Sequence, residues 1–415
     1  MRVADLARLA LRNLARNRRR TLLSLAIVAA GTAAMVLTAG FVRFSFDGLR
    51  EAMIHGGLGH LEIADADAVA ARPGALDREP SAAFGDWRAL RDELETQPHV
   101  AAVGANLHLM GLAQTAEGRS ASFVAVGVEP DREVRMGFET RVRDGEALAA
   151  APPEPGADRA LLALGLASTL GVRPGDRVTL LAQTESGTLD ALDVEVAGLV
   201  TTGVAELDTR WIKLPLASAQ RLAGTDRISN LLVALDDTRS TDAALERVRA
   251  RLAGRPLAVT PWPERAPFYG QVRGLYLGIF VFLGAIVGVL VVLAASNTLV
   301  MAVMERVREI GTLRAIGTGR GQIAALLLVE AAWLGLFGAV AGSLLGLAGI
   351  GTINALDLHM PPPPGAVDPI DLELAVVPEA FLGAALLMIV VLLVAALLPA
   401  LRAARLVIID ALGHT

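Results

Sequence analysis

Cysteine is absent from this chain of 415 residues. Disulfide frameworks, thiol nucleophiles and cysteine metal sites are therefore excluded. Lysine is nearly absent as well, because Lys213 in the segment RWIKLP is the only one. A P-loop needs a lysine within Gly-Lys-Ser/Thr to hold the terminal phosphates of a nucleotide. The chain therefore does not hydrolyse ATP through such a loop.

Charged residues are scarce, at 20% of the chain against 53% hydrophobic residues, and the mean hydropathy is +0.50. This composition is too apolar for an ordinary soluble protein of this length. The net charge of -5 argues against a nucleic-acid partner, which usually requires a basic surface.

Residues with the chemistry of an active site are not grouped in the sequence. No Ser/His/Asp arrangement, nucleophile elbow or pair of catalytic carboxylates stands out, so we expect no catalytic residues and no intrinsic enzymatic activity. His55 and His60 stand close together in IHGGLGHLEI, but the glycines between them favour a loop, and a metal would need further ligands. We therefore expect no metal site.

Long apolar runs are the most prominent feature that is present. Four segments, residues 21–42, 274–304, 321–356 and 380–401, are each long enough to cross about 30 Å of hydrocarbon. Together they contain one charged residue, Glu330, for which we expect a structural pairing with Arg306 or Arg320.

Arginines flank these runs asymmetrically. They precede the first run, separate the second from the third and follow the fourth, whereas residues 357–379 carry only acidic charge. By the positive-inside rule both termini are then cytoplasmic, and residues 43–273 lie outside. We interpret the first run as an uncleaved anchor.

The first 20 residues have the pattern of an amphipathic helix. Its arginine stripe and its apolar side are formed by Arg8, Arg12, Arg16 and Arg19 and by Val3, Leu6, Ala10 and Leu14. This pattern favours a helix lying on the inner leaflet. A charge cluster that only sets the topology is the alternative.

Residues 43–273 change character and predict a mixed α+β domain. RVTLLAQ and LDVEVAGLV flank the turn SGT and indicate a hairpin. Residues 86–97 and 240–254 have helical patterns, the second with Ser240 or Thr241 as N-cap. In the other outside loop, MPPPPG (360–365) indicates a stiff polyproline turn.

The segment MERVREIGTLRAIGTGRGQI, residues 304–323, is a charged interruption between two spans. A helix over residues 303–315 would place Val307, Ile310 and Leu313 near one side and allow Glu305 to pair with Arg308. GTGRG then permits a sharp turn into the third span. A solvated connector is the alternative interpretation.

Four stretches of the sequence resemble the FtsX-like (MacB-type) permease family, the membrane subunits of one class of ABC transporter. They are LALRNLARNRRRTLLSLAIVAAGTA, LGVRPGDRVTL with VEVAGLVTTGVAELDTRWIKLPLASAQRL, NTLVMAVMERVREIGTLRAIGTGRGQIAALLLVEAAWLGLFGAVAGSLLG, and LPALRAARLVIIDAL. The resemblance covers nearly the whole chain. It implies four transmembrane helices with a large α+β periplasmic domain, the MacB-type core, inserted between helices 1 and 2.

The resemblance also implies that residues 305–320 contain a coupling helix that docks on a separate ATPase subunit. The expected contact residues are Glu305, Arg308, Glu309, Ile310, Gly311, Leu313, Arg314, Ala315 and Gly317. Family members work as two permeases with two ATPases, so the second permease is the same or a homologous chain. The resemblance implies no cofactor in this chain, with ATP and Mg on the ATPase, and mechanical transmission across the bacterial inner membrane.

On this basis the chain divides into nine segments. They are a cytoplasmic amphipathic helix (1–20), transmembrane helix 1 (21–42), the periplasmic domain (43–273), transmembrane helix 2 with a stalk (274–304), the coupling helix and loop (305–320), transmembrane helix 3 (321–356), the periplasmic Pro-rich loop (357–379), transmembrane helix 4 (380–401) and a cytoplasmic tail (402–415).

Within the family, GHLEIADADAV and the lack of a fused ATPase are more similar to the lipoprotein-releasing permeases. This branch implies extraction of a lipoprotein or another lipid-like substrate from the outer leaflet, with a periplasmic lipoprotein carrier or an adaptor as a further partner. The alternatives are tripartite export of an amphipathic small molecule or peptide, and a non-transporting regulator of a periplasmic partner.

Two groups of residues carry weaker signals. Aromatic residues mark the outer ends of spans one and two, as an interfacial belt or as a lipid gate between them: Phe41, Phe44, Phe46, Phe268, Tyr269, Tyr276, Phe280 and Phe282. Glycines on spans two and three permit close helix packing, within the chain or at a dimer seam: Gly284, Gly288, Gly338, Gly342 and Gly346.

Overall fold

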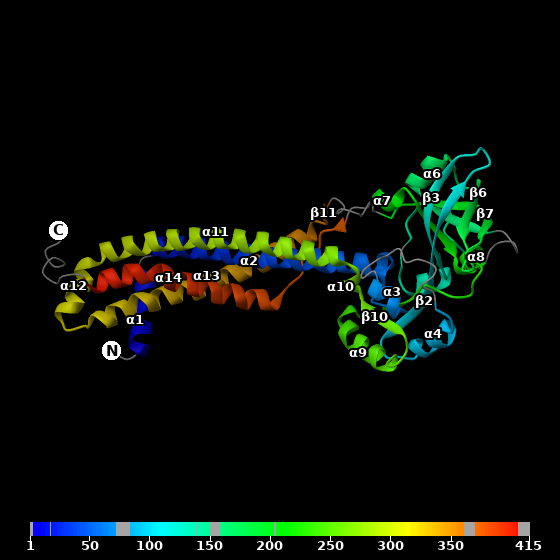
Figure 1. The fold of residues 1–415 in the computed structure, drawn as a ribbon. Helices are drawn as coiled ribbons and strands as arrows, with labels where there is room; N and C mark the ends of the chain where they lie inside the picture. Colours follow the sequence, from blue (N-terminus) through cyan, green and yellow to red (C-terminus); the bar gives the residue numbers. More distant parts are fainter. Residues whose placement is uncertain are drawn as a thin grey trace. The chain divides into compact units, whose positions relative to one another are not determined.

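The computed structural model describes residues 3–16, 18–71, 84–138, 140–149, 158–202, 205–360 and 370–405. The chain divides into two compact units (Figure 1). The helical unit comprises the described residues of Met1–Asp47, Arg273–Met360 and Ile370–Thr415, and the sheet unit comprises those of Gly48–Val272. The predicted polyproline turn lies, from residue 361 on, outside the described residues.

Four long helices form the helical unit: α2 (Arg18–Met53), α11 (Pro267–Glu305), α13 (Arg320–Ala355) and α14 (Pro378–Ala404). Each is long and apolar enough to cross a membrane. α2 and α11 extend beyond the predicted spans 21–42 and 274–304. In α2 the extension is supported by an ion pair across one turn, because Arg43 Nε donates to Asp47 at 2.6 Å.

The shorter elements of this unit lie at the ends of the bundle. Helix α1 (Val3–Arg16) precedes α2, and helix α12 (Val307–Ala315) connects α11 to α13. Strands β11 (His359–Met360) and β12 (Ile370–Asp371) pair antiparallel beyond α13. Figure 1 shows α1 and α12 near the same end of the bundle.

All four long helices contribute side chains to the bundle core, among them Val28, Val291, Leu334 and Met388. Glycines allow α13 to approach α2 closely. A Cβ at Gly342 would lie 2.5 Å from the carbonyl oxygen of Ala29, and one at Gly338 would lie 2.6 Å from Val28. Gly346 similarly faces Val36. These three predicted packing glycines therefore pack within the chain.

The other two predicted packing glycines, Gly284 and Gly288, lie on α11 and meet no described atom within 4 Å of a built Cβ, their own helix backbone aside. Much of α11 presents apolar side chains outward, with Val281 at 64% and Phe282 at 65% exposure. Such a helix suits contact with lipid or with another span.

The sheet unit contains ten strands in its described residues. They are β1 (Leu61–Asp65), β2 (Val100–Gln114), β3 (Ser120–Val128), β4 (Val142–Gly145), β5 (Arg159–Ala163), β6 (Arg177–Gln183), β7 (Leu189–Val200), β8 (Trp211–Pro215), β9 (Asn230–Leu235) and β10 (Leu257–Pro261). The pairing β2-β3-β8-β5-β7-β6 returns to β2, so these strands close a ring. Leu109, Phe123, Leu180 and Ile212 lie in its buried core.

Helices flank these strands. They are α3 (Ala66–Ala71), α4 (Trp87–Glu95), α5 (Pro130–Arg135), α6 (Leu164–Leu170), α7 (Ala205–Asp208), α8 (Leu216–Ala223), α9 (Thr241–Arg251) and α10 (Trp262–Arg265), with a π turn η1 (Ile54–Leu58) and a 3-10 turn η3 (Thr238–Ser240). The predicted mixed α+β character is thus confirmed.

Most local predictions for this unit are confirmed. β6 and β7 form the expected antiparallel hairpin, and α4 and α9 occupy the two helical patterns. Ser240 is the N-cap residue of α9, as predicted, but its side chain makes no capping bond. Asp237 caps η3 instead, and Thr241 donates back to the carbonyl of Thr238.

β1 and β10 are neighbours at one edge of the sheet, so the chain enters and leaves the unit side by side. A buried ion pair fixes this edge. Arg265 Nε lies 3.1 Å from Glu62 Oε2, with 5% and 1% of the side chains exposed, and Arg265 also donates to the carbonyl of Leu58. Asn230 donates to Glu62 from the far side at 2.5 Å.

Replacing Arg265 by lysine keeps the charge but loses the planar fork that reaches both acceptors. We expect the Arg265→Lys variant to lose about 1–2 kcal/mol of unfolding free energy, measured by denaturant titration of the full chain in detergent. Arg227→Lys, at an ion pair with Glu185 in which the arginine side chain is 43% exposed, should cost less than about 0.5 kcal/mol. Equal losses in both variants would contradict the view that the buried contacts of Arg265 fix this edge of the sheet.

Candidate functional site

The segment between α11 and α13 is not the single helix predicted over residues 303–315. α11 ends at Glu305, and Arg306 has φ -111° and ψ 16°, so the backbone breaks there before α12 begins. α12 ends at Ala315, and the turn that follows requires a glycine, because Gly317 has φ +100° while its N–H donates to the carbonyl of Arg314. The result is a short separate helix between two spans.

One side of α12 anchors it to the bundle. Val307, Ile310 and Gly311 are buried, and Ile310 packs with Ile323 and Leu327 of α13. The predicted contact of Ile310 and Gly311 with an ATPase stays a prediction, and in this chain both residues are buried against the bundle. Leu313 packs in part against the same cluster.

The other side of α12 is open. Glu305, Arg308, Ala315 and Gly317 are exposed, and Arg314 is half-buried. Arg308 has no hydrogen bond or ion pair of its side chain among the described residues. A charged donor that projects from a short, anchored helix is well suited to bind a protein partner.

Glu309 lies between these two sides and is held by two arginines. Arg306 Nε donates to it at 2.9 Å and Arg16 of α1 at 2.8 Å. Partial burial works to raise the pKa of Glu309, but the hydrogen bonds from the two arginines outweigh it and lower that pKa below its usual value. Glu309 is therefore a charged acceptor that connects α12 to α1.

Helix α1 has the amphipathic character that the sequence predicts. Leu6 and Ala10 are buried against Leu326 and its neighbours on α13, while Arg8 and Arg12 are exposed. The apolar side of α1 thus packs on protein. The predicted pairing of Glu330 is also present, with Arg306 Nη1 3.2 Å from Glu330 Oε1.

The structure brings together three of the eight predicted gate residues. The rings of Phe46 and Tyr276 meet edge to face at 6.2 Å, and Tyr276 lies 6.4 Å from Phe280. Phe41 packs elsewhere, against the cluster of Val36 and Leu374. An aromatic contact between Phe46 and Tyr276 thus joins α2 to α11.

The remaining predicted aromatics do not join this contact. Phe44 is half-buried on α2, and Phe282 points outward from α11. Phe268 and Tyr269 belong to the sheet unit, where Tyr269 packs edge to face on Trp262 at 4.9 Å. Tyr269 is therefore part of the apolar cluster around Ile54, not of a gate.

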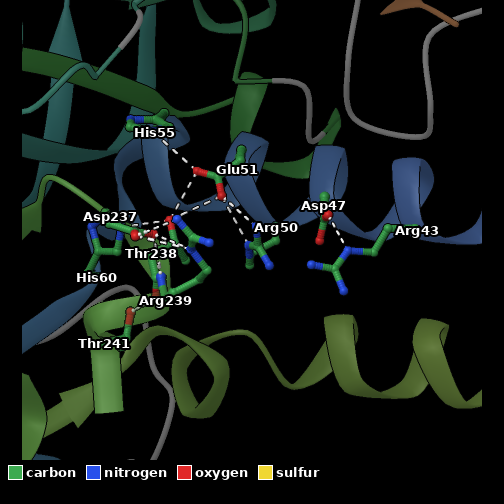
Figure 2. Close-up of polar contacts among 10 residues, drawn as sticks. All are labelled: Arg43, Asp47, Arg50, Glu51, His55, His60, Asp237, Thr238, Arg239 and Thr241. Atoms are coloured by element: carbon green, nitrogen blue, oxygen red, sulfur yellow. Dashed lines mark hydrogen bonds and ion pairs between the residues drawn. The ribbon is translucent and has the colours of Figure 1, made fainter. Parts of the chain in front are cut away.

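A polar chain lies within the sheet unit, which begins at Gly48 and therefore includes the last turn of α2 (Figure 2). The Leu235 N–H donates to His60 Nδ1 at 3.1 Å, so Nε2 carries the hydrogen and donates to Thr238 at 3.0 Å. The Thr238 hydroxyl donates in turn to Glu51 at 3.1 Å. The loop predicted around His55 and His60 is present in part: His55 lies in η1, which is non-helical at Gly57, and the chain is irregular at Gly59 and His60 before β1 begins. The His60 side chain is buried.

Burial lowers the pKa of His60 to about 4, although the nearby Glu51 works to raise it. Between pH 6.5 and pH 4, His60 therefore binds a proton more readily in the unfolded chain, where its pKa is near 6.5, than in the folded chain. Stability must fall as the pH falls through this window. We expect the free energy of unfolding to fall by about 2 kcal/mol when the pH is lowered from 7 to 5, because of the titration of His60.

The measurement is tryptophan fluorescence of the full chain during denaturant unfolding at each pH. The His60→Gln variant does not titrate at this position, so its stability should decline less over the same range. Parallel pH profiles for the wild type and His60→Gln would contradict the assignment.

These features define a multi-pass membrane protein in which a folded domain follows the first span and a short helix joins the second span to the third. The same layout is found by comparison with known families. The MacB-like periplasmic core domain matches residues 21–251, and the FtsX-like permease C-terminal region matches residues 278–408. The chain belongs to the FtsX-like permeases with a MacB-like periplasmic core domain, and is thus an ABC transporter permease, a class without catalytic activity of its own.

Relatives are similar at modest identity. The lipoprotein-releasing system transmembrane protein LolC of Neisseria meningitidis is 27% identical over 275 residues, which is 63% of this chain and 64% of that protein. An uncharacterized ABC transporter permease of Methanocaldococcus jannaschii is 28% identical over 167 residues, 39% of this chain and 42% of that protein. The chain thus spans less than two thirds of the length of these relatives.

Among solved structures, the periplasmic region of MacB from Actinobacillus actinomycetemcomitans aligns with a TM-score of 0.35 and 15% identity, covering 50% of this chain and 92% of that one. The family match confirms the fold predicted from the sequence, with an α+β periplasmic domain between the first and second of four spans.

Proposed function

We propose that this permease extracts a lipoprotein or another lipid-like substrate from the outer leaflet of the bacterial inner membrane, driven by a separate ATPase that docks on α12. The observation that carries the proposal is the two-sided α12, anchored by Ile310 and open at Arg308. In this proposal α12 and both termini face the cytoplasm. ATP and Mg bind the ATPase, and two ATPases serve two permeases, identical or homologous.

The choice of a lipid-like substrate is supported by the outer ends of the stalk helices. Phe46 of α2 contacts Tyr276 of α11, while the surface of α11 around them is apolar and exposed. An acyl chain could enter between α2 and α11 where this aromatic contact opens. Its surroundings would change from lipid tails to apolar side chains, which costs little free energy because both are apolar. The similarity to a lipoprotein-releasing protein supports the same substrate class.

The Phe46→Ala/Tyr276→Ala variant removes this contact without adding a charge to a span. We expect release of a fluorescent triacylated lipopeptide from proteoliposomes to fall about tenfold, since the aromatic surface contributes on the order of 1–2 kcal/mol. ATPase binding and basal ATP hydrolysis should not change. Phe337→Ala, an exposed aromatic on α13, is the matched control.

Release that is equal in the variant and the control would remove the gate from the proposal. Mass spectrometry of the purified complex tests the substrate class directly. Bound lipid, lipoprotein or a periplasmic lipoprotein carrier in the complex supports extraction. An export adaptor would instead support tripartite export, and a cell-wall hydrolase would support regulation of a periplasmic partner.

A further inference from the structure

Arg306 occupies the break between α11 and α12 and contacts two acidic residues at once. Its Nε donates to Glu309 of α12 at 2.9 Å, and its Nη1 lies 3.2 Å from Glu330 of α13. Only 13% of the Arg306 side chain and 11% of the Glu330 side chain are exposed. One guanidinium therefore joins the connecting helix to the third span.

A small cavity, lined mostly by apolar side chains, lies beside this contact. It has a volume of about 60 Å³, and its walls include Arg306, Glu309 and Glu330 with Asn13, Ser24 and Thr298 from three neighbouring helices. This volume is enough for about two waters. Water can hydrate the ion pair there, but the cavity contains no second cation among the described residues that could replace Arg306 for Glu330.

Apolar contacts also join α12 to α13, chiefly those of Ile310 with Ile323 and Leu327. Apolar contacts are non-directional, so they hold two helices together without fixing how far one slides along the other. Hydrogen bonds are directional, and a buried arginine that loses its acid leaves an unpaired charge. The Arg306 contacts, which are directional and largely buried, therefore restrain the register of α12 on α13.

Arg16 contributes less to this register. Its contact with Glu309 is on the surface, where 61% of the Arg16 side chain is exposed. Exposed ion pairs of this kind contribute little and exchange readily with solvent ions or a partner. The buried half of the network, from Glu309 through Arg306 to Glu330, is the part that can transmit a displacement.

We propose that Arg306 is a positioning residue: by holding Glu309 and Glu330 together, it makes α12 and α13 move as one body when α12 is displaced. The inference deepens the proposed function and rests on an ATPase acting on α12. Glu330, a rare charged side chain inside a span, then serves to hold Arg306 on α13 and is not a site for a transported ion.

The first test needs no change in the network. The chain lacks cysteine, so a Thr312→Cys/Leu336→Cys variant places one spin label on exposed α12 and one on exposed α13. Distances are measured in the full permease–ATPase complex without nucleotide and with a non-hydrolysable ATP analogue. We expect the same distance distribution in both states, and a nucleotide-dependent change of that distance would overturn the inference.

The second test removes the anchor in the same labelled background. Glu330→Gln keeps the shape of the side chain but not its charge. We expect the distance distribution between the two labels to broaden and to differ with and without nucleotide. We also expect the lipopeptide released per ATP to fall about tenfold. Arg306→Lys should recover part of the coupling that Arg306→Gln loses. Thr298→Val, in the same cavity but outside the ion pair, is the control and should couple normally.

Wild-type coupling in Glu330→Gln would overturn the inference. The same preparations report separately on the proposed function, because ATPase co-purification with the unaltered chain is measured first. Absence of the ATPase there would count against the proposed docking on α12, while a bound ATPase with unchanged coupling in Glu330→Gln would count against Arg306 alone.

Discussion

Reversing the charge of Arg308 is expected to weaken binding of the ATPase about a hundredfold, because truncating or inverting a central interfacial charge costs about 2–5 kcal/mol. Arg308 is a clean probe. It projects from α12 into the open, and no described side chain depends on it, so Arg308→Glu changes the surface and not the fold. Affinity is measured by titrating the purified ATPase onto the permease in nanodiscs.

The control for Arg308→Glu is Arg402→Glu. Arg402 is also exposed, in the last turn of α14, whose Ala400 and Ala403 pack in the same cluster as Ile310. It therefore presents an arginine near α12 but not on it. If both variants bind the ATPase as the wild type does, α12 is not the docking surface. If both lose binding equally, a general loss of positive charge is responsible.

Placing leucine at Gly342 is expected to prevent stable packing of the four spans. A Cβ there would lie 2.5 Å from the Ala29 carbonyl oxygen and 2.5 Å from Thr32 Cβ, distances that only a shift of the α2 backbone could relieve. Overpacking of this kind costs about 1–3 kcal/mol for small insertions, and the backbone clash with three further carbons should exceed that range. Thermal unfolding in detergent measures the loss.

Gly351→Leu is the matched control for Gly342→Leu. It lies on the same helix, and a Cβ there meets no described neighbour within 4 Å. Its effect should stay within about 0.5 kcal/mol of the wild type. Equal unfolding temperatures for the two variants would mean that α13 does not depend on close approach to α2.

The spans and the domain order were predictable because each follows from a local property of the sequence. Hydropathy over about 20 residues is sufficient to find a span. Likewise RVTLLAQ and LDVEVAGLV contain both strands and the turn of the β6–β7 hairpin. The pairing of Glu330 was predictable as well, since a lone acid in a span needs a cation and Arg306 stands at the nearby end of the preceding helix.

The break at Arg306 was not predictable, because residues 303–315 contain no proline and no glycine near that point. It arises from tertiary contacts, as the Arg306 side chain reaches Glu330 on another helix. The inward side of Ile310 and Gly311 has the same origin. Periodicity identifies an apolar side of a helix but not whether another helix or a partner protein covers it.

Glu62 and Arg265 were missed for a related reason. In the strand LEIAD an alternating pattern suggests that Glu62 is exposed. Its partner Arg265 lies about two hundred residues later in the chain, and the two meet only because β1 pairs with β10.

The central claim is that an ATPase acts on α12 from the cytoplasm, and one labelling experiment tests it most directly. Thr312→Cys puts a single reactive thiol on exposed α12, and Leu189→Cys puts one on the sheet unit, where Leu189 is 79% exposed. Intact cells are treated with a membrane-impermeant maleimide, before and after permeabilisation, with and without the ATPase. We expect Leu189→Cys to react at once, and Thr312→Cys to react only after permeabilisation and less when the ATPase is present. Labelling of Thr312→Cys from outside, or labelling that the ATPase leaves unchanged, would contradict the account.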